Sequence, residues 1–273
     1  MKISICLFGI TRSLPYTANS INDHVIAAAQ KFGEIRVHGH FYNVKAIRNA
    51  RSLENSVIKS GHYDLLNFDK LEIEEPDIFL PTSSFEKVKS YGDAWEDDFQ
   101  SLKNLFHQLH SIDKSYKLAG DYAADITLFA RPDLLYHDDL TEIFERAAAI
   151  KSDSAVLVPR WQAFGGVNDR FALAIGDTAA RAVSGRLGLA ERFCSTGSEP
   201  LHSERLLKFA LDEASVRIET HGLRASRVRS NGLRAKEIFD HSLPGRIKAN
   251  AAYRINLLMD RIGLGLPSIA TKE

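Results

Sequence analysis

Short apolar runs of strand length alternate with amphipathic stretches along this chain, and that alternation limits the fold more than any other feature. Residues 3–10, 126–130 and 155–159 are almost continuously apolar, which is typical of strands buried on both faces. Between these runs, segments 21–33 and 94–118 carry apolar residues at helical spacing, as expected of helices with one buried face. The pattern predicts an α/β fold in which helices cover both faces of a sheet.

The same alternation continues toward the C-terminus. Further strands are expected at 35–42, 171–175 and 216–219, and further helices at 140–147, 177–189 and 201–214. Segment 44–90 has a weaker pattern, broken by glycine and proline, and predicts only short helices and a strand. The strand at 35–42 places His38 and His40 on one side by its two-residue period.

The charge balance and the cysteine count narrow the class of protein. The chain has 273 residues and 35 Lys and Arg against 35 Asp and Glu, so no overall field favours nucleic acid. Its two cysteines, Cys6 and Cys194, are too few for a disulfide framework or a cysteine zinc site. No stretch approaches the roughly 18 apolar residues that span a bilayer. We therefore expect a cytoplasmic protein in a reducing compartment.

Two parts are expected from the distribution of charge. A domain at 1–221 precedes a basic extension at 222–273, in which 10 Lys and Arg outnumber 4 Asp and Glu. Within the extension, residues 244–262 carry apolar side chains at helical spacing among basic residues. Such a helix could pack on the domain, join two copies in a homodimer, or lie peripherally on an anionic membrane. The sequence leaves these alternatives open.

Two short motifs follow predicted strands, where an α/β sheet places its ligands. In the first, Gly9 permits a tight turn before Thr11 and Arg12, and Arg12 could meet a phosphate. In the second, Arg131 and Asp133 project to the same side of an extended chain and could share one ligand. The alternative for the second motif is a purely structural ion pair.

The segment 163–172 is the most informative stretch. The pair Gly165–Gly166 lets the backbone approach a ligand closely, and Asn168, Asp169 and Arg170 then present an amide, a carboxylate and a guanidinium. Three polar side chains between two phenylalanines need partners once they are buried. The alternative is an Asx-turn held by a structural salt bridge.

A loop rich in small residues, 195–205, leads into the last predicted helix. It carries Glu199 and Glu204 near the helix N-terminus, where the helix dipole stabilises acidic side chains. The two carboxylates could therefore cap the helix or take part in catalysis. Two histidines are similarly open, since His40 and His202 could each be a metal ligand, a general base or a structural side chain.

The order and spacing of these four motifs resemble those of bacterial glycosyltransferases of GT-A-like fold that assemble capsular, O-antigen or other surface polysaccharides. The similar features are a first strand that ends in a Gly-x-x-Arg turn at residues 9–12, an R-x-D-L strand end at 131–134, and a GG-x-N-D-R-F-A segment at 165–172. The second strand's ending, 37–42, with its histidines, is also similar to a strand of that group. The resemblance covers roughly residues 1–220 and implies a GT-A-like, Rossmann-like mixed sheet.

The resemblance also implies a nucleotide-sugar donor, whose diphosphate gains negative charge as it leaves. The implied donor-binding residues are Gly9, Thr11, Arg12, Arg131, Asn168 and Arg170. Asp133 is the implied ligand of a divalent metal, Mn²⁺ or Mg²⁺, or of the donor's ribose, although Arg131 takes the place of the first acid of the better known Asp-x-Asp. The candidates for a catalytic carboxylate are Asp169, then Glu199 and Glu204. Inverting and retaining transfer stay equally open.

Taken together, the motifs predict a hexosyltransferase that moves a sugar from a nucleotide-sugar donor to a glycan or lipid-linked acceptor in surface polysaccharide biosynthesis. The alternative is a catalytically silent relative that binds a nucleotide or glycan and acts as a scaffold, because Arg131 replaces an acid. A hydrolytic or nucleotidyl-transferring enzyme would need additional clustered carboxylates, which the motifs do not contain.

Overall fold

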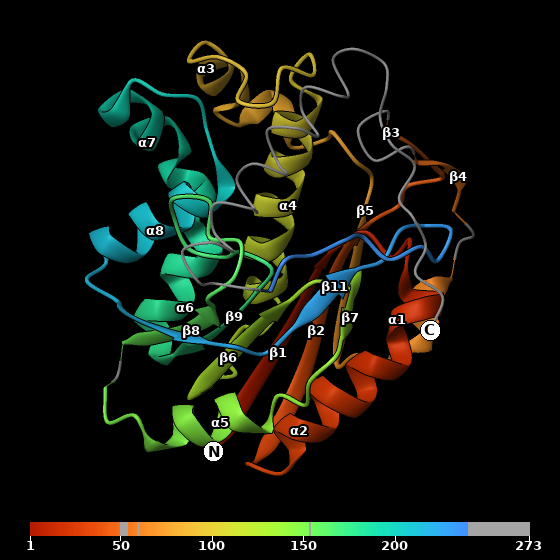
Figure 1. Cartoon of the computed structure of the whole chain (residues 1–273), viewed down its shortest axis with the longest axis vertical. Helices are drawn as coiled ribbons and strands as arrows, with labels where there is room; N and C mark the ends of the chain where they lie inside the picture. Colours follow the sequence, from red (N-terminus) through yellow and green to blue (C-terminus); the bar gives the residue numbers. More distant parts are fainter. Residues whose placement is uncertain (50–53, 59–60, 153, 240–273) are drawn as a thin grey trace.

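A seven-stranded sheet forms the centre of the computed structural model, which describes residues 1–49, 54–58, 61–152 and 154–239 (Figure 1). In spatial order the strands are β10 (Arg217–His221), β8 (Ala155–Pro159), β9 (Phe171–Ile175), β6 (Ile126–Ala130), β1 (Lys2–Gly9), β2 (Glu34–Tyr42) and β5 (Lys70–Glu74). β9 is antiparallel to both of its neighbours, whereas every other neighbouring pair in this sheet is parallel. The sheet is therefore mixed.

Helices cover both faces of the sheet (Figure 1). One face carries α1 (Leu14–Ile21), a π-helical turn (Asn22–Ile26), α2 (Ala27–Gln30) and α5 (Thr141–Ala149), and the other carries α4 (Gln100–Lys117), α6 (Gly176–Ser184) and α8 (Ser203–Glu213). The predicted α/β fold with a mixed sheet flanked by helices is confirmed.

Smaller elements surround these layers. They are the strand pairs β3 (Ala46–Asn49) with β4 (Glu54–Val57) and β7 (Leu134–Tyr136) with β11 (Ala225–Arg227), the helices α3 (Phe85–Lys89) and α7 (Ala190–Gly197), and 3-10 helices at His62–Leu65, Leu80–Thr82 and Gly185–Leu189. The short helices and strands between β2 and α4 agree with the weak pattern of that segment.

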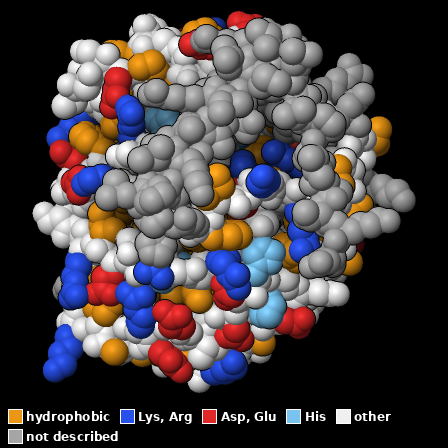
Figure 2. Space-filling model, in the orientation of Figure 1, with side chains coloured by type: hydrophobic (Ala, Val, Ile, Leu, Met, Phe, Trp, Pro, Cys, Tyr) orange, Lys and Arg blue, Asp and Glu red, His pale blue; other side chains and the backbone are white. Residues whose placement is uncertain are grey.

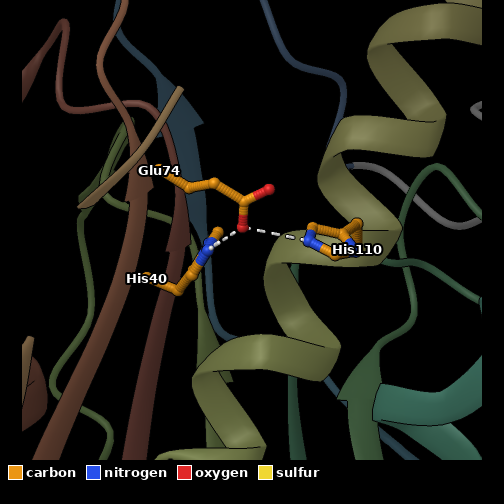
Figure 3. A group of neighbouring side chains, drawn as sticks. All are labelled: His40, Glu74 and His110. Atoms are coloured by element: carbon orange, nitrogen blue, oxygen red, sulfur yellow. Dashed lines mark hydrogen bonds and ion pairs between the residues drawn. The ribbon is translucent and has the colours of Figure 1, made fainter. Parts of the chain in front are cut away.

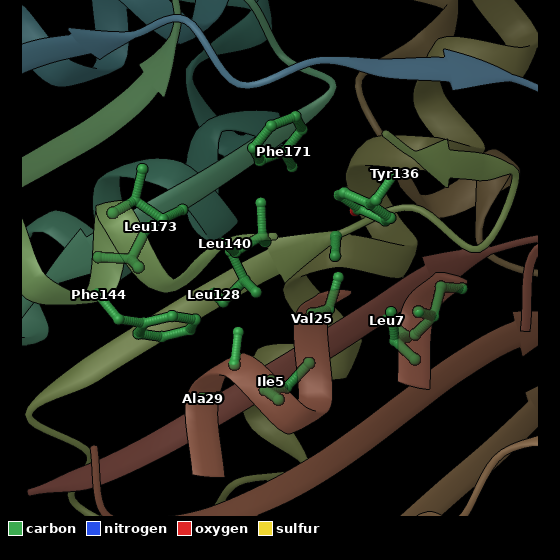
Figure 4. Packing of buried hydrophobic residues seen from close by; sticks show 14 of the residues in the cluster. Ile5, Leu7, Val25, Ala29, Leu128, Tyr136, Leu140, Phe144, Phe171 and Leu173 are labelled. Atoms are coloured by element: carbon green, nitrogen blue, oxygen red, sulfur yellow. The ribbon is translucent and has the colours of Figure 1, made fainter. Parts of the chain in front are cut away.

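Alternating side chains of β1 pack into both helical layers. Ile3, Ile5 and Leu7 belong to the cluster formed with α1, α2 and α5 (Figure 4), whereas Cys6 and Phe8 pack with α4, α6 and α8 on the opposite face. Full burial of a Leu, Ile or Phe side chain contributes roughly 1.5–3 kcal/mol. β1 is thus held from both sides, and its carboxyl end is a rigid place from which to present a loop.

α4 begins later than the apolar spacing predicts. The carboxylate of Asp93 accepts the backbone N–H groups of Trp95, Asp97 and Phe99 at 2.8–3.0 Å and holds a tight turn. Because Phe99 adopts a left-handed φ of 60°, the helix starts only at Gln100. The apolar stripe still packs in the core, since a side chain in a turn can be buried as well as one in a helix.

Two other predicted helices differ in a simpler way. The helix expected at 21–33 is the second half of a longer one that begins at Leu14, where Pro15 suits the first turn. The helix expected at 244–262 lies outside the described residues. Of the predicted extension at 222–273, the structure describes the part up to Phe239, and its β11 pairs with β7 of the main body. No described helix is long and apolar enough to cross a membrane.

The strand order brings the candidate motifs to one edge of the sheet. From β1 the chain adds β2 and β5 on one side and then returns to place β6 on the other side of β1, which makes a switch point between β1 and β6. Ligands of open α/β sheets bind outside the carboxyl ends of the strands at such a point. Because antiparallel β9 places Phe171 opposite Ala130, the residues before β9 lie at the same edge.

Candidate functional site

Three sequence motifs meet in one chain of hydrogen bonds at this edge. Arg12, after β1, donates to Asp133 at 3.3 Å, and Arg131, after β6, donates to both oxygens of Asp133 at 2.7 and 2.9 Å. Arg131 also donates to Gln108 of α4 at 3.1 Å, and Gln108 donates to Asp169, before β9, at 3.1 Å. Segments more than a hundred residues apart in the chain therefore share one polar network.

Asp133 acts in this network as the acceptor for two guanidinium groups. The carboxylate is almost fully buried, and burial alone would raise its pKa, but the charges of Arg131 and Arg12 outweigh burial and hold the pKa well below its usual range. Both oxygens already accept from arginine. The arrangement therefore gives no support to the predicted role of Asp133 as a metal ligand, which stays a prediction.

Backbone contacts fix the loop that carries Arg131 and Asp133. Thr17 of α1 donates its hydroxyl to the carbonyl oxygen of Pro132 at 2.6 Å, and the carbonyl oxygen of Asp133 accepts the N–H of Val228 at 2.8 Å. The residues just after β6 are thus held between α1 and the segment that follows β11. An Arg–carboxylate pair on such a fixed backbone keeps its fork geometry.

The glycine-rich turn before β9 packs directly against the start of α8. A Cβ at Gly166 would lie 2.0 Å from the carbonyl oxygen of Glu204, so only glycine fits there. Val167 then donates its N–H to that same oxygen at 2.9 Å. Asn168 donates to the carbonyl oxygen of Trp161 and accepts the N–H of Arg170 at 2.9 Å. Asn168 thus holds the turn together, as the Asx-turn alternative expects, and its predicted contact with a donor is not tested.

Asp169 is buried and ionised at the end of the network. Its Oδ2 accepts from Gln108 and from the hydroxyl of Ser203. Burial raises the pKa of Asp169, but the positive charges of Arg170 and Arg186 and the Ser203 hydroxyl outweigh it and lower the pKa below the ordinary value. A carboxylate whose charged form is favoured therefore lies beside the arginines at the switch point.

The other two candidate carboxylates lie at the start of α8 but differ in environment. Glu204 is buried, approaches His202 Nδ1 at 3.2 Å and lies close enough to Arg186 to favour its charged form. Glu199 is about a third exposed and pairs with Arg205. Glu204 is thus near the network and Glu199 belongs to the protein surface, while the catalytic roles predicted for both are untested.

Several arginines gather at this edge, and we call five of them the arginine cluster. Its members are Arg12, Arg131, Arg170, Arg227 and Arg229. Burial, and next the positive charge of Arg227, lower the pKa of both Arg170 and Arg229. For Arg229 the pKa falls to about 10. Within the described residues, no acceptor lies within hydrogen-bond distance of the buried Nε–H groups of Arg12 and Arg170. Buried charged donors without acceptors are unusual and favour a bound anion.

Residues outside the sequence motifs complete the cluster. Glu54 of β4 accepts from Arg12 at 3.0 Å and from Arg229 at 3.3 Å, and Arg227 donates to Glu237 at 2.8 Å. These carboxylates offset part of the positive charge. The sequence pattern of segment 44–90, which contains Glu54, is too weak to single this residue out. Arg227 and Arg229 belong to the basic extension, and only the excess of positive charge there pointed to them.

The first motif forms the turn between β1 and α1. Gly9 has a φ of 112°, which favours glycine, and its N–H donates to the hydroxyl of Ser111 in α4 at 2.8 Å. Thr11 is buried and accepts the N–H of Leu14 at its carbonyl oxygen, which starts the helix. The turn places Arg12 in the cluster, while the contacts of Gly9 and Thr11 with a donor stay predictions.

A separate group of possible metal ligands lies at the ends of β2 and β5. His40 Nε2 and His110 Nε2 are each 3.1 Å from the same oxygen of Glu74, and the three ligand atoms all lie within 4.8 Å of one another (Figure 3). Burial lowers the pKa of His40, and the hydrogen bonds from His110 and His40 lower that of Glu74 against the effect of burial. Two imidazoles and a carboxylate are a donor set that fits a divalent metal. Of these three residues, the sequence motifs had singled out only His40.

The second histidine candidate lies elsewhere. His202 stacks on Trp95 with ring centroids 5.8 Å apart, and its imidazole contacts Glu204. It is not part of the group in Figure 3. On the face shown in Figure 2, Lys and Arg side chains gather near the middle of the molecule.

Comparison with known proteins gives distant structural similarities. No protein-family model and no curated protein matches the chain. Among solved structures, mouse xyloside xylosyltransferase 1 is similar over 81% of this chain and 85% of its own, with 11% identity and a TM-score of 0.39. The mannosyltransferase Ktr4p from S. cerevisiae is similar over 81% and 69%, with 10% identity and a TM-score of 0.46. For the galactosyltransferase LgtC, coverage is 81% and 73%, identity 13% and the TM-score 0.38. Scores of this size decide neither family nor activity.

Proposed function

We propose that this chain is a GT-A-like glycosyltransferase that moves a sugar from a nucleotide-sugar donor to a glycan or lipid-linked acceptor in bacterial surface polysaccharide biosynthesis. The observation that carries the proposal is the arginine cluster outside the carboxyl ends of β1 and β6, in which two buried Nε–H groups have no acceptor among the described residues. The motifs that resemble such enzymes supply several of its members. A switch point of an open α/β sheet is the ordinary place for such a ligand.

The chemistry of donor cleavage fits guanidinium groups at this edge. When the anomeric C–O bond breaks, the diphosphate takes the electron pair and gains negative charge, which preorganised cations stabilise. The side chains of Arg12 and Arg131 are 11% and 17% exposed, enough for a phosphate to reach their edges. Because Asp133 holds Arg131 by two hydrogen bonds, that guanidinium needs little reorientation when a diphosphate binds.

Asp169 is the proposed active-site carboxylate. Its lowered pKa favours the ionised carboxylate. The carboxylate can therefore accept the proton of an acceptor hydroxyl as the hydroxyl oxygen bonds to the anomeric carbon. Ser203 and Gln108 orient it. A divalent metal would supply further charge neutralisation at the diphosphate. The residues whose donor set fits a metal, His40, Glu74 and His110, form a separate group at the ends of β2 and β5.

The test is a screen of UDP-, GDP-, CMP- and dTDP-sugars for thermal stabilisation, followed by assays of sugar release to water and of transfer to glycan acceptors. We expect one donor class to raise the melting temperature of the folded protein. Asp169→Asn should keep that stabilisation and lower turnover by roughly 10²–10⁴-fold. Exposed Glu191, which pairs with Lys87, gives the control Glu191→Gln, which should match wild type. Absence of both binding and turnover with every donor would overturn the proposal.

A second candidate function is supported by the pairing of Asp133. Because this carboxylate is committed to Arg12 and Arg131, the cluster could bind a nucleotide or a glycan without turning it over, as a scaffold would. The same screen separates the two functions. Stabilisation by a donor without any release or transfer, in wild type and Asp169→Asn alike, would favour the scaffold.

A further inference from the structure

The group formed by His40, Glu74 and His110 joins three separate elements. His40 lies near the end of β2, Glu74 is the last residue of β5, and His110 is on α4. The side chain of His40 is fully buried, whereas those of Glu74 and His110 are 15% and 16% exposed. His40 is therefore fixed in the core, whereas the other two ligands are partly exposed to solvent, from which an ion can reach them.

The hydrogen bonds of Ser111 determine which nitrogen of His40 carries the proton. The Ser111 hydroxyl accepts the N–H of Gly9 at 2.8 Å and donates its single hydrogen to the carbonyl oxygen of His40 at 2.8 Å. It is also 2.9 Å from His40 Nδ1. Since that hydroxyl has no second hydrogen to give, Nδ1 must be the donor in this contact. Nε2 of His40 is then the ring nitrogen left to face Glu74.

Nε2 of His40 faces a carboxylate oxygen. Nε2 of His40 is 3.1 Å from Glu74 Oε2, which already receives His110 at 3.1 Å. The two atoms need a positive charge between them, which a proton on Nε2 or a metal ion supplies. We propose that His40, Glu74 and His110 bind one divalent transition metal of the zinc class, with Ser111 fixing the orientation of His40 as a metal-ligating histidine requires.

The donor set distinguishes this ion from Mg²⁺. Imidazole nitrogens suit Zn²⁺ and its neighbours, whereas Mg²⁺ prefers oxygen ligands and water. Three protein ligands, two His and one Glu, leave a coordination position open, as in catalytic rather than structural zinc sites. A further carboxylate, Glu72, is 4.0 Å from His40 Nε2 and is held by Lys114 at 2.9 Å. The stacking of Phe79 on His110, with centroids 4.0 Å apart, holds the third ligand in place.

The experiment is metal binding by the full, untagged chain after treatment with a chelator. Calorimetry with Zn²⁺ should show one ion per chain, with Mg²⁺ at least 100-fold weaker, and Co²⁺ should give a visible absorption band of low-symmetry nitrogen and oxygen coordination. Glu74→Gln and His110→Gln should each remove this binding. Ser111→Ala should weaken it by roughly 10–100-fold, as expected for loss of an orienting partner.

Asp77→Asn provides the matched control, because Asp77 also pairs with a histidine of α4, His107 at 2.8 Å, but without a second imidazole. This variant should bind Zn²⁺ as wild type does. Circular dichroism checks that each variant is folded. Glu74 and His110 are changed because their side chains are 15% and 16% exposed, whereas that of His40 is fully buried. The inference is overturned if Zn²⁺ does not bind, if Mg²⁺ binds equally well, or if folded Glu74→Gln and His110→Gln retain binding. Donor binding at the arginine cluster is measured separately, so either proposal can fail alone.

Discussion

At the scale of single residues, the site depends on a close approach of two backbones. Gly166 and the carbonyl oxygen of Glu204 are so close that a Cβ would meet that oxygen at 2.0 Å. This contact sets the position of the turn that carries Asp169 and Arg170. A backbone atom cannot move aside as a flexible side chain can, so any larger residue must displace either the turn or the start of α8.

Gly166→Ala is therefore expected to destabilise the protein by about 1–3 kcal/mol, the usual cost of forcing extra volume into a packed site. Urea unfolding measures this difference in the free energy of unfolding. Gly188 is the matched control, because a Cβ there meets nothing within 4 Å. Gly188→Ala should leave stability unchanged or raise it slightly. Equal stability of the two variants would show that the turn is looser than described.

At the scale of elements, α4 connects the two candidate sites. Its Gln108 bridges Arg131 and Asp169, its His110 contacts Glu74, and its Ser111 joins Gly9 to His40. These side chains reach their partners only if the helix starts at the right residue. The turn capped by Asp93 sets that start.

Asp93→Ala should lower the free energy of unfolding by about 1–2 kcal/mol, because three backbone N–H groups before α4 lose their acceptor. Thermal or urea unfolding tests this. Asp113→Ala on the same helix removes only a surface pair with Lys117 and should change stability by no more than about 0.5 kcal/mol. The prediction is contradicted if the Asp93 variant is as stable as the Asp113 variant.

The sequence predicts the helices and strands better than it predicts which side chains of different elements contact one another. The strands at 126–130 and 155–159 are found at the predicted residues. A short, continuous apolar run is buried on both faces when it forms a strand of a sheet covered by helices. Arg12 and Arg131 belong to recognisable motifs at strand ends, and Asp169 belongs to the glycine-rich motif before β9. The sequence analysis did not predict Gln108 and His110 as site residues. On a long amphipathic helix, the spacing of polar residues does not distinguish those that line a site from those that face solvent. Which of them faces the site depends on where the helix starts and how it packs.

At the scale of the whole molecule, buried histidines tie stability to pH. His221 is 2% exposed, accepts the N–H of Leu223 at Nδ1, and contacts Phe171 with ring centroids 5.3 Å apart. Burial, with the charges of Arg146 and Arg160, lowers its pKa from 6.5 to about 3. The folded state therefore resists protonation that the unfolded chain accepts.

Stability should consequently fall as pH drops from 6.5 toward 3, because in that window the unfolded state takes up the proton first. His221 alone contributes a loss of up to about 1.4 kcal/mol per pH unit there. His221→Asn keeps an acceptor for the Leu223 N–H but does not titrate. Urea unfolding between pH 7 and 5 should show a shallower fall for this variant than for wild type. Parallel curves would contradict the assignment.

The most direct test of the central claim is a crystal structure of the chain with a nucleoside diphosphate. The account predicts that the diphosphate oxygens lie within hydrogen-bond distance of at least two of Arg12, Arg131 and Arg170, outside the carboxyl ends of β1 and β6. A nucleotide bound at another surface, with these guanidinium groups arranged as they are without it, would contradict the account.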